Sequence, residues 1–262
     1  MSEFKRGITK PNFIAELNGN KYWQQMVNDQ DLFIAIRNNY LNVYYYGQSI
    51  CKVEFVNNEI KWTSHPKYLG QSGKKPMNTG DYLEKIEELK LNTEKYRSEE
   101  KEKVKENFLN DKRLCILDVE ITFGTEVDAG RRSIDFLAIE KDSIGKIRLV
   151  FYEAKCYNNK EIRSRTNPRV FEQIEKYEKA LRSHRHEILN SYRLVYENIK
   201  ELNLNNKKNL VQFIGSESER LEIDDEPRLI IFVDESQIDN THIQKLKARF
   251  GDSRTILKIS AA

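Results

Sequence analysis

The sequence predicts an α/β (α+β) protein in which a small antiparallel β region precedes a larger mixed core. Three observations lead to this fold class. Hydrophobic segments rich in β-branched and aromatic residues, separated by short turns, fill residues 32–63. A Gly- and Pro-rich stretch follows at 65–80. Beyond it, helical and strand-like segments follow in the order helix, three strands, helix, strand.

The β region has four strand-like segments: 32–36, 41–46, 49–56 and 59–63. The links between them have residue types that tolerate the positive φ of tight hairpin turns: Asn38-Asn39, Gly47-Gln48 and Asn57-Asn58. These features predict an antiparallel meander of three or four strands.

The meander segments are rich in aromatic residues: Tyr40, Tyr44, Tyr45, Tyr46 and Trp62. Aromatic residues favour strands, so one interpretation is that these side chains fill the meander core. The other is that they form a platform on which nucleic-acid bases stack. Two further interpretations are a role of the meander in self-association, giving a homo-oligomer, and a role as a module that clamps DNA.

The Gly- and Pro-rich stretch predicts a domain boundary, with a meander module at 1–75 and a second domain at 76–262. That domain opens with a helical pattern at 82–109, whose charged middle is either an exposed helix or a break between two helices. Further elements are expected in chain order: strands at 113–123, 131–140 and 147–156, a long helix at 168–201, a strand at 228–233, a helix at 241–249 and a strand at 254–259.

Composition limits the class of protein. The 262 residues are 39% hydrophobic and 32% charged, with a net charge of +3. No apolar run approaches the ~20 residues that span a bilayer, and the first residues lack the apolar stretch of a signal peptide. We therefore expect a cytoplasmic protein without a membrane partner. Its three cysteines are too widely spaced for a disulfide framework or a zinc site, and we expect them to be buried.

The charged residues of greatest chemical interest lie in two neighbouring strand-like segments. The first contains Asp135, and the second contains Glu153 and Lys155. Because a strand alternates its faces, Glu153 and Lys155 project from the same side. If the two strands pair as a hairpin, Asp135 comes alongside them. Carboxylates in apolar surroundings require a cationic partner, and hard oxygen ligands suit Mg²⁺ or Mn²⁺.

The segments Ile134-Asp-Phe-Leu and Phe151-Tyr-Glu-Ala-Lys155 resemble the signature of the PD-(D/E)XK nuclease superfamily, in which an acid on one strand precedes Glu-x-Lys on the next. Gln173-x-x-x-Tyr177 resembles the motif that follows Glu-x-Lys in the RecB-type branch of that superfamily. The resemblance covers roughly residues 83–181 and does not include the first eighty. It implies a restriction-endonuclease-like αβββαβ core and a Mg²⁺- or Mn²⁺-dependent deoxyribonuclease.

The resemblance also implies a role for each site residue. Asp135 and Glu153 are expected to hold the cation, and Lys155 to orient the attacking water or offset charge on the phosphate. Gln173 and Tyr177, four residues apart, share one helix face and are expected beside the site. Strand alternation places Glu120 on one face of the preceding strand together with Asp118, so Glu120 is a third candidate metal ligand. The sequence does not choose between it and three acids of the preceding helix: Glu99, Glu102 and Glu106.

Basic residues are concentrated near these candidates. Residues 141–213 contain sixteen Lys or Arg and nine Asp or Glu. Four cations crowd the loop between the Glu-x-Lys strand and the following helix: Lys160, Arg163, Arg165 and Arg169. We expect them to bind nucleic-acid phosphates. The alternative is an ordinary solvated loop.

These observations predict a metal-dependent nuclease that hydrolyses phosphodiester bonds, with DNA as the expected substrate. The resemblance implies a role in phage defence or repair, often beside a helicase or ATPase partner. Two alternatives stay open. One is a non-catalytic nucleic-acid-binding or assembly subunit on the same fold, and the other is an RNase.

Overall fold

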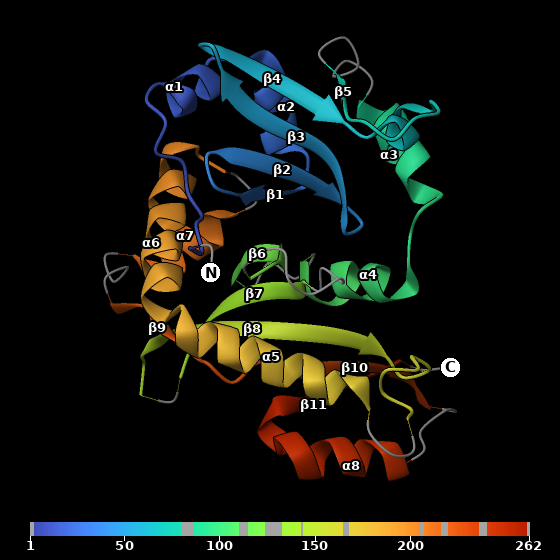
Figure 1. Cartoon of the computed structure of the whole chain (residues 1–262). Helices are drawn as coiled ribbons and strands as arrows, with labels where there is room; N and C mark the ends of the chain where they lie inside the picture. Colours follow the sequence, from blue (N-terminus) through green and yellow to red (C-terminus); the bar gives the residue numbers. More distant parts are fainter. Residues whose placement is uncertain are drawn as a thin grey trace. The chain divides into compact units, whose positions relative to one another are not determined.

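The computed structural model is a mixed α/β protein with two separate β-sheets (Figure 1). It describes residues 3–79, 86–109, 115–123, 133–142, 144–164, 168–204, 207–215, 220–235 and 240–260. The chain divides into two compact units, each built from separate segments. The meander unit comprises Lys5–Cys115 and Glu187–Glu219. The mixed-sheet unit comprises Met1–Phe4, Ile116–His186 and Arg220–Ala262.

The meander unit contains the predicted antiparallel sheet, with strands in sequence order. Its strands are β1 (Phe33–Ile36), β2 (Tyr40–Tyr45), β3 (Gln48–Val56), β4 (Glu59–Ser64) and β5 (Met77–Asn78). The short β5 exceeds the three or four strands that the sequence predicts. At the β3–β4 turn, Asn57 and Asn58 both have positive φ, 56° and 61°, as a two-residue hairpin turn requires.

The meander aromatics mostly fill the core, because Tyr44, Tyr45 and Trp62 are buried. The ring of Tyr46 is covered by the Arg97 guanidinium, whose central carbon lies 3.5 Å from the ring centroid. Tyr40 has the Lys52 ammonium over its ring at 4.5 Å. None of these five side chains is fully exposed, so they do not form the open stacking platform that was the second interpretation.

Several helices belong to the meander unit: α1 (Phe13–Asn18), α2 (Lys21–Asn28), α3 (Ile86–Glu94), α4 (Glu99–Val104), nearly all of α6 (Arg185–Glu201), and α7 (Lys208–Ile214). The charged middle of the 82–109 region is a break between α3 and α4, and residues 80–85 lie outside the described part of the chain. At the start of α4, the Ser98 side chain accepts a hydrogen bond from the Lys101 N–H, a typical N-cap.

The N-terminal segment is attached to α6 by the side chain of Asn198. Asn198 Oδ1 accepts a hydrogen bond from Ile8 N at 2.7 Å, and Asn198 Nδ2 donates to Ile8 O at 3.3 Å. Gly7 has φ +110°, and a Cβ there would lie 2.4 Å from Leu194 Cδ2. Glycine is therefore required at position 7 both for the backbone angle and for the close approach to α6.

The mixed-sheet unit is built on the sheet order β11-β10-β8-β7-β6. Its strands are β6 (Cys115–Ile121), β7 (Ile134–Lys141), β8 (Ile147–Cys156), β9 (Glu222–Ile223), β10 (Arg228–Asp234) and β11 (Thr255–Ser260). β7 and β8 are antiparallel, whereas β8, β10 and β11 are parallel neighbours. The central strand β8 is buried at almost every position, which explains its near-continuous hydrophobic sequence.

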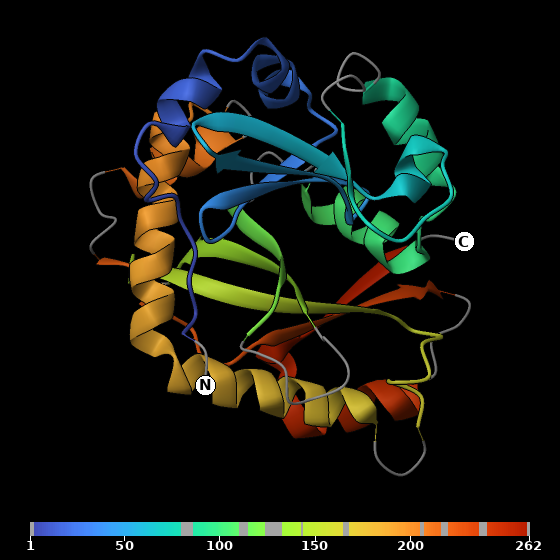
Figure 2. The ribbon, with the colours of Figure 1, turned by 45° about the horizontal axis from the view of Figure 1, so that its top comes forward.

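Helices α5 (Arg169–Ser183) and α8 (Asn240–Phe250) cover the same face of this sheet (Figure 2). The rings of Phe171 and Phe250 meet edge-on, with centroids 5.2 Å apart. The single helix predicted at 168–201 is wrong: α5 ends at Ser183, His184 leaves helical geometry, and α6 begins at Arg185. No Gly or Pro marks this break in the sequence.

The α/β class predicted from the sequence is confirmed. In chain order the elements α4, β6, β7, β8, α5 and β10 follow the expected pattern, with α6, α7 and β9 inserted before β10. None of the helices in the described residues is long and apolar enough to cross a membrane. Whether residues 1–75 fold as a separate module stays a prediction. The three cysteines are buried, as expected.

Candidate active site

The β7–β8 hairpin brings Asp135 and Glu153 to the same level of the sheet. Phe136 pairs with Tyr152, so the next positions along the two antiparallel strands are Asp135 and Glu153. The Asp135 carboxylate accepts a hydrogen bond from the Ala154 backbone N–H at 2.7 Å. Two acids on adjacent strands are therefore brought together, as the sequence predicts.

Lys155 neutralises part of this negative charge. Its Nζ lies 2.5 Å from Glu153 Oε1 and 3.7 Å from a carboxylate oxygen of Glu161. Glu153 is only 1% exposed, and Lys155 is also buried. Strand alternation places the two side chains on one side, and burial makes their pairing necessary.

Gln173 and Tyr177 extend this cluster from α5. Gln173 Nε2 donates to Glu153 Oε1 at 2.5 Å and to the Tyr177 hydroxyl at 2.8 Å. The Tyr177 hydroxyl in turn donates to the Ser133 carbonyl at 3.0 Å. The spacing of four residues therefore aligns both side chains toward the β7–β8 hairpin, where they hold Glu153 in position.

The electrostatics of the site are dominated by the two acids. Asp135 as a whole residue is half-buried, but its carboxyl group is buried. This burial raises the pKa of Asp135 well above its usual range. The negative charge of Glu153 raises the same pKa further, while Lys155 and the Ala154 N–H lower it. Burial also raises the pKa of Tyr177, which keeps its hydroxyl protonated as a hydrogen-bond donor.

Glu120 comes close to this pair by an unusual backbone conformation. It has φ 50° within β6, and its carboxylate accepts a hydrogen bond from Ser133 Oγ at 2.8 Å. Its charge contributes to the raised pKa of Asp135. Simple alternation with Asp118 does not describe this segment, because Asp118 is buried and accepts a hydrogen bond from the Val119 N–H while Glu120 is half-exposed. A non-glycine residue in this conformation is strained, and such strain concentrates at functional sites.

The side-chain oxygen atoms of this site are in part suited to bind a hard divalent cation. Asp135 and Glu153 supply carboxylate oxygens, and the Gln173 Oε1 atom is buried without a hydrogen-bond partner. Within the described residues, however, no three Asp, Glu, His or Cys side chains are grouped to hold a metal ion. Mg²⁺ is commonly bound by one or two protein carboxylates, with water and substrate phosphate completing its shell. The site fits this mode of binding rather than a cage made of protein ligands.

The basic loop residues lie on the surface after β8. Lys160, Arg163 and Arg169 are exposed, and Arg165 lies outside the described residues. The loop is anchored by the fully buried Ile162. Three cations are therefore available to an anionic ligand in the segment that leads from Lys155 to α5.

Two residues of the cluster were not anticipated from the sequence. Ser133 contacts both Glu120 and Tyr177, and Glu161 is the second acid beside Lys155. The backbone of Glu161 is held by a hydrogen bond from its N–H to Asn159 Oδ1 at 2.9 Å and by one from Val170 N to its carbonyl at 3.3 Å. Ser133 had a weak signal, its position two residues before Asp135. Glu161 had none.

No protein-family model, curated protein or solved structure matches this chain. The resemblance noted in the sequence therefore depends on the residues quoted for it.

Proposed function

We propose that the chain is a divalent-cation-dependent nuclease with Asp135, Glu153 and Lys155 at its active site. The observation that carries this proposal is the excess of negative charge at one level of the β7–β8 hairpin. The buried Lys155 pairs with Glu153, while burial and the negative charge of Glu153 raise the pKa of the neighbouring Asp135. A buried group with a perturbed pKa and defined charge partners is typical of a functional site.

Each residue has a role that follows from its contacts. Asp135 and Glu153 would hold Mg²⁺ or Mn²⁺, with Glu120 as the nearby third acid. A bound divalent cation polarises a phosphodiester and lowers the pKa of a coordinated water. Lys155, 2.5 Å from Glu153, would place positive charge beside the phosphate as negative charge develops there. Gln173 would fix the Glu153 carboxylate, and Tyr177 would fix Gln173.

The substrate proposed is DNA, as the sequence resemblance implies. The exposed Lys160, Arg163 and Arg169 support a polyanionic substrate, because cations beside a carboxylate site offset the repulsion between acids and phosphates. The same cations serve RNA equally well, so the choice between the two nucleic acids is left to the cleavage assay.

A second candidate is a non-catalytic nucleic-acid-binding subunit. The specific observation that favours it is the Lys155–Glu153 ion pair, which neutralises Glu153 without a metal ion.

Incubation of the full chain with end-labelled single- and double-stranded DNA and RNA, in Mg²⁺, Mn²⁺ or EDTA, tests the two candidates. We expect cleavage in Mn²⁺ or Mg²⁺ and none in EDTA. Asp135→Ala and Glu153→Ala should abolish it, whereas Glu222→Gln, on an exposed ion pair with Lys146, should not. Binding without cleavage under every condition would favour the second candidate. Cleavage that persists in EDTA would contradict the first.

A further inference from the structure

A cation lies between two tyrosine rings on the surface of the meander unit. Lys67, in the 3₁₀ helix Pro66–Leu69, has its Nζ 4.5 Å from the centroid of the Tyr68 ring and 4.6 Å from that of Tyr96. The two rings meet edge-on at 5.9 Å. Tyr96 is 42% exposed, so a large part of its surface faces solvent beside a positive charge.

The support beneath this pair is rigid. Tyr68 is buried against Leu69 and Leu89, and its hydroxyl donates to Gln48 Oε1 at 2.9 Å. Asn92 Nδ2 donates to the Tyr68 carbonyl at 3.3 Å, which ties the 3₁₀ helix to α3. An aromatic side chain held on such a base can receive a flat ligand at a small cost in conformational entropy.

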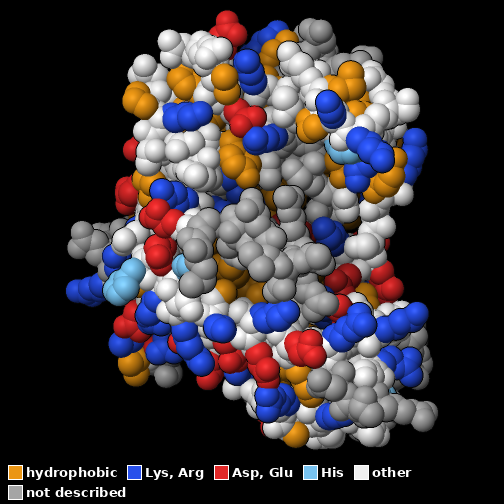
Figure 3. Space-filling view, in the orientation of Figure 1, with side chains coloured by type: hydrophobic (Ala, Val, Ile, Leu, Met, Phe, Trp, Pro, Cys, Tyr) orange, Lys and Arg blue, Asp and Glu red, His pale blue; other side chains and the backbone are white. Residues whose placement is uncertain are grey.

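The segment that contains Lys67 is basic: residues 60–80 contain four lysines, one histidine and no Asp or Glu. The segment around Tyr96 is mixed, with the exposed acids Glu94 and Glu99. Lys74 and Lys75 are exposed and follow Gly73, which packs near Pro66. Lys95, next to Tyr96, is also exposed. Figure 3 shows Lys and Arg side chains gathered with hydrophobic ones and a histidine at the upper right, over the region of α3.

We propose that this lysine–tyrosine patch, formed by Lys67, Lys74, Lys75, Lys95 and Tyr96, binds single-stranded nucleic acid. Phosphates would lie against the lysines, and an unpaired base would stack on the exposed surface of Tyr96. A duplex keeps its base faces in the helical stack, so it can use the lysines but not the ring.

This inference goes beyond the proposed nuclease function, since it requires neither a metal ion nor any residue of the carboxylate site. The test is therefore made in EDTA with the full chain. Fluorescence anisotropy is measured with a labelled single strand of about 20 nucleotides, longer than a single-strand site of ~4–16 nucleotides. The matching duplex and phosphatidylserine vesicles are measured in parallel.

We expect the single strand to bind more tightly than the duplex and the vesicles. Tyr96→Ala should weaken single-strand binding at least about fivefold, as loss of one stacked base does, while Tyr96→Phe should retain it. Lys67→Glu should weaken it at least about tenfold. The double variant Lys74→Ala/Lys75→Ala should reduce the slope of log affinity against log salt by about 1.4, or ~0.7 for each lost phosphate contact.

Lys21→Glu is the matched control. Lys21 is an exposed lysine of α2, outside the lysine–tyrosine patch, and its Nζ lies 4.7 Å from the centroid of the Tyr22 ring. It should leave affinity unchanged. If Lys67→Glu fails to fold, Lys74→Glu/Lys75→Glu carries the same expectation. The proposal is overturned if Tyr96→Ala binds as well as the unaltered chain, if Lys21→Glu is as damaging as Lys67→Glu, or if vesicles bind more tightly than the single strand. Loss of cleavage in Asp135→Ala does not bear on it.

Discussion

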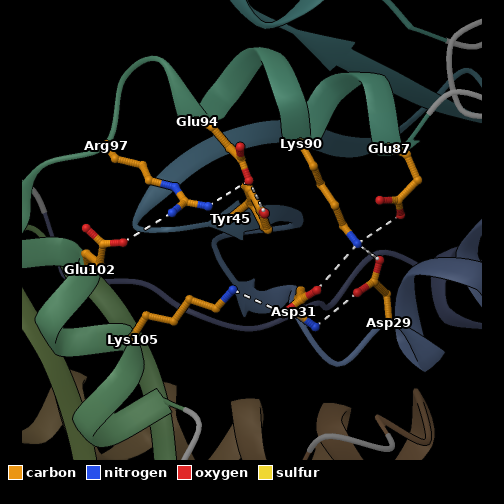
Figure 4. A network of polar contacts seen from close by, with 9 residues as sticks. All are labelled: Asp29, Asp31, Tyr45, Glu87, Lys90, Glu94, Arg97, Glu102 and Lys105. Atoms are coloured by element: carbon orange, nitrogen blue, oxygen red, sulfur yellow. Dashed lines mark hydrogen bonds and ion pairs between the residues drawn. The ribbon is translucent and has the colours of Figure 1, made fainter.

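Two clusters of charged side chains combine the same residue types in opposite ways. One is the carboxylate site of the mixed-sheet unit, formed by Asp135, Glu153 and Lys155. The other is the polar network of the meander unit (Figure 4). In the network the two lysines, Lys90 and Lys105, are buried, and their acidic partners reach water. Lys90 lies 2.6 Å from Asp29 and 3.0 Å from Glu87, and Lys105 lies 3.2 Å from Asp31. The side chains of Asp31 and Glu87 are 60% and 75% exposed.

In the carboxylate site an acid is the deeply buried group. Glu153 is almost fully buried beside Lys155, and Asp135 forms no ion pair with any residue in the described ranges. Each network acid named above has both a cation and solvent. The network can therefore be explained by the attachment of α3 and of the helical turn Lys105–Leu109 to the segment between α2 and β1. Among the described residues, Lys155 is the cation that pairs with the acids of this site, and it does not pair with Asp135. Incomplete charge pairing, rather than the number of charges, is the difference between the two clusters.

The largest expected effect is the loss of Lys155. Lys155→Ala leaves Glu153 buried without its cation, which should cost about 3–5 kcal/mol of unfolding free energy. Lys90→Ala leaves acids that water can solvate and should cost about 1–2 kcal/mol. Urea unfolding of both variants in EDTA measures the difference. Equal losses would remove the distinction between the two clusters.

Added Mn²⁺ should raise the stability of the Lys155→Ala variant more than that of the Lys90→Ala variant. We expect Mn²⁺ to restore part of the stability lost in Lys155→Ala, because it would replace the missing positive charge beside Glu153. Lys90→Ala, with the same charge change, is the control and should gain no more from Mn²⁺ than the unaltered chain. The comparison is made by thermal unfolding with and without Mn²⁺.

Asp135→Asn should have opposite effects on the metal-free and metal-bound protein. Asparagine cannot ionise, so repulsion from Glu153 disappears, and Tm in EDTA should rise by about 2–4 °C, the response to about 1 kcal/mol in a chain of this size. The additional Tm increase caused by Mn²⁺ should be lost. Glu222→Gln should change neither value. A lower Tm in EDTA would show that Asp135 stabilises the fold.

The sign of the pH dependence follows from the raised pKa of Asp135. The folded state retains a proton that the unfolded state releases, so the ionised carboxylate lowers stability above the ordinary pKa of about 4. As pH falls through the raised pKa, this penalty disappears. In EDTA the advantage of Asp135→Asn over the unaltered chain should therefore shrink toward acid pH. A constant difference across that range would contradict the assignment.

The smallest effect is expected at Lys105. Burial lowers the pKa of this lysine, and its ammonium lies 3.8 Å from the centroid of the Tyr46 ring. Lys105→Met keeps the apolar part of the side chain. It removes the cation beside Asp31, but the Asp31 carboxylate is exposed and stays solvated by water. The free energy of unfolding at neutral pH should therefore change by less than about 1 kcal/mol. The penalty on the charged form is present below the lowered pKa and is lost as pH rises toward about 10.4. Urea unfolding at neutral and alkaline pH checks both statements.

Strands were predictable from the sequence where apolar residues run without interruption. The segment 147–156 coincides with β8, and Glu153 and Lys155 share a side because alternation is a property of the backbone itself. The approach of Asp135 followed from the hairpin. The turn residues Asn57 and Asn58 behaved as their tolerance of positive φ predicts.

The features of the fold and the site that the sequence did not predict depend on tertiary contacts, which leave no local pattern in the sequence. The positive φ of Glu120 breaks the alternation on which its predicted orientation was based, and its Ser133 partner follows residues 124–132, which lie outside the described part of the chain. Glu161 reaches Lys155 from a loop. The end of α5 at Ser183 has no Gly or Pro, and the two-residue strands β5 and β9 are too short for any periodicity.

The hydrogen bonds between Ile8 and Asn198 have a consequence for synthesis on the ribosome. The two residues are 190 positions apart, so the first segment emerges long before its partner exists. At ~5–20 residues per second, the interval is about 10–40 s. Throughout that time the meander unit lacks α6 and the mixed-sheet unit lacks β10 and β11. The meander unit cannot be completed as a nascent chain until Glu187–Glu219 has been translated, nor the mixed-sheet unit until Arg220–Ala262 has followed.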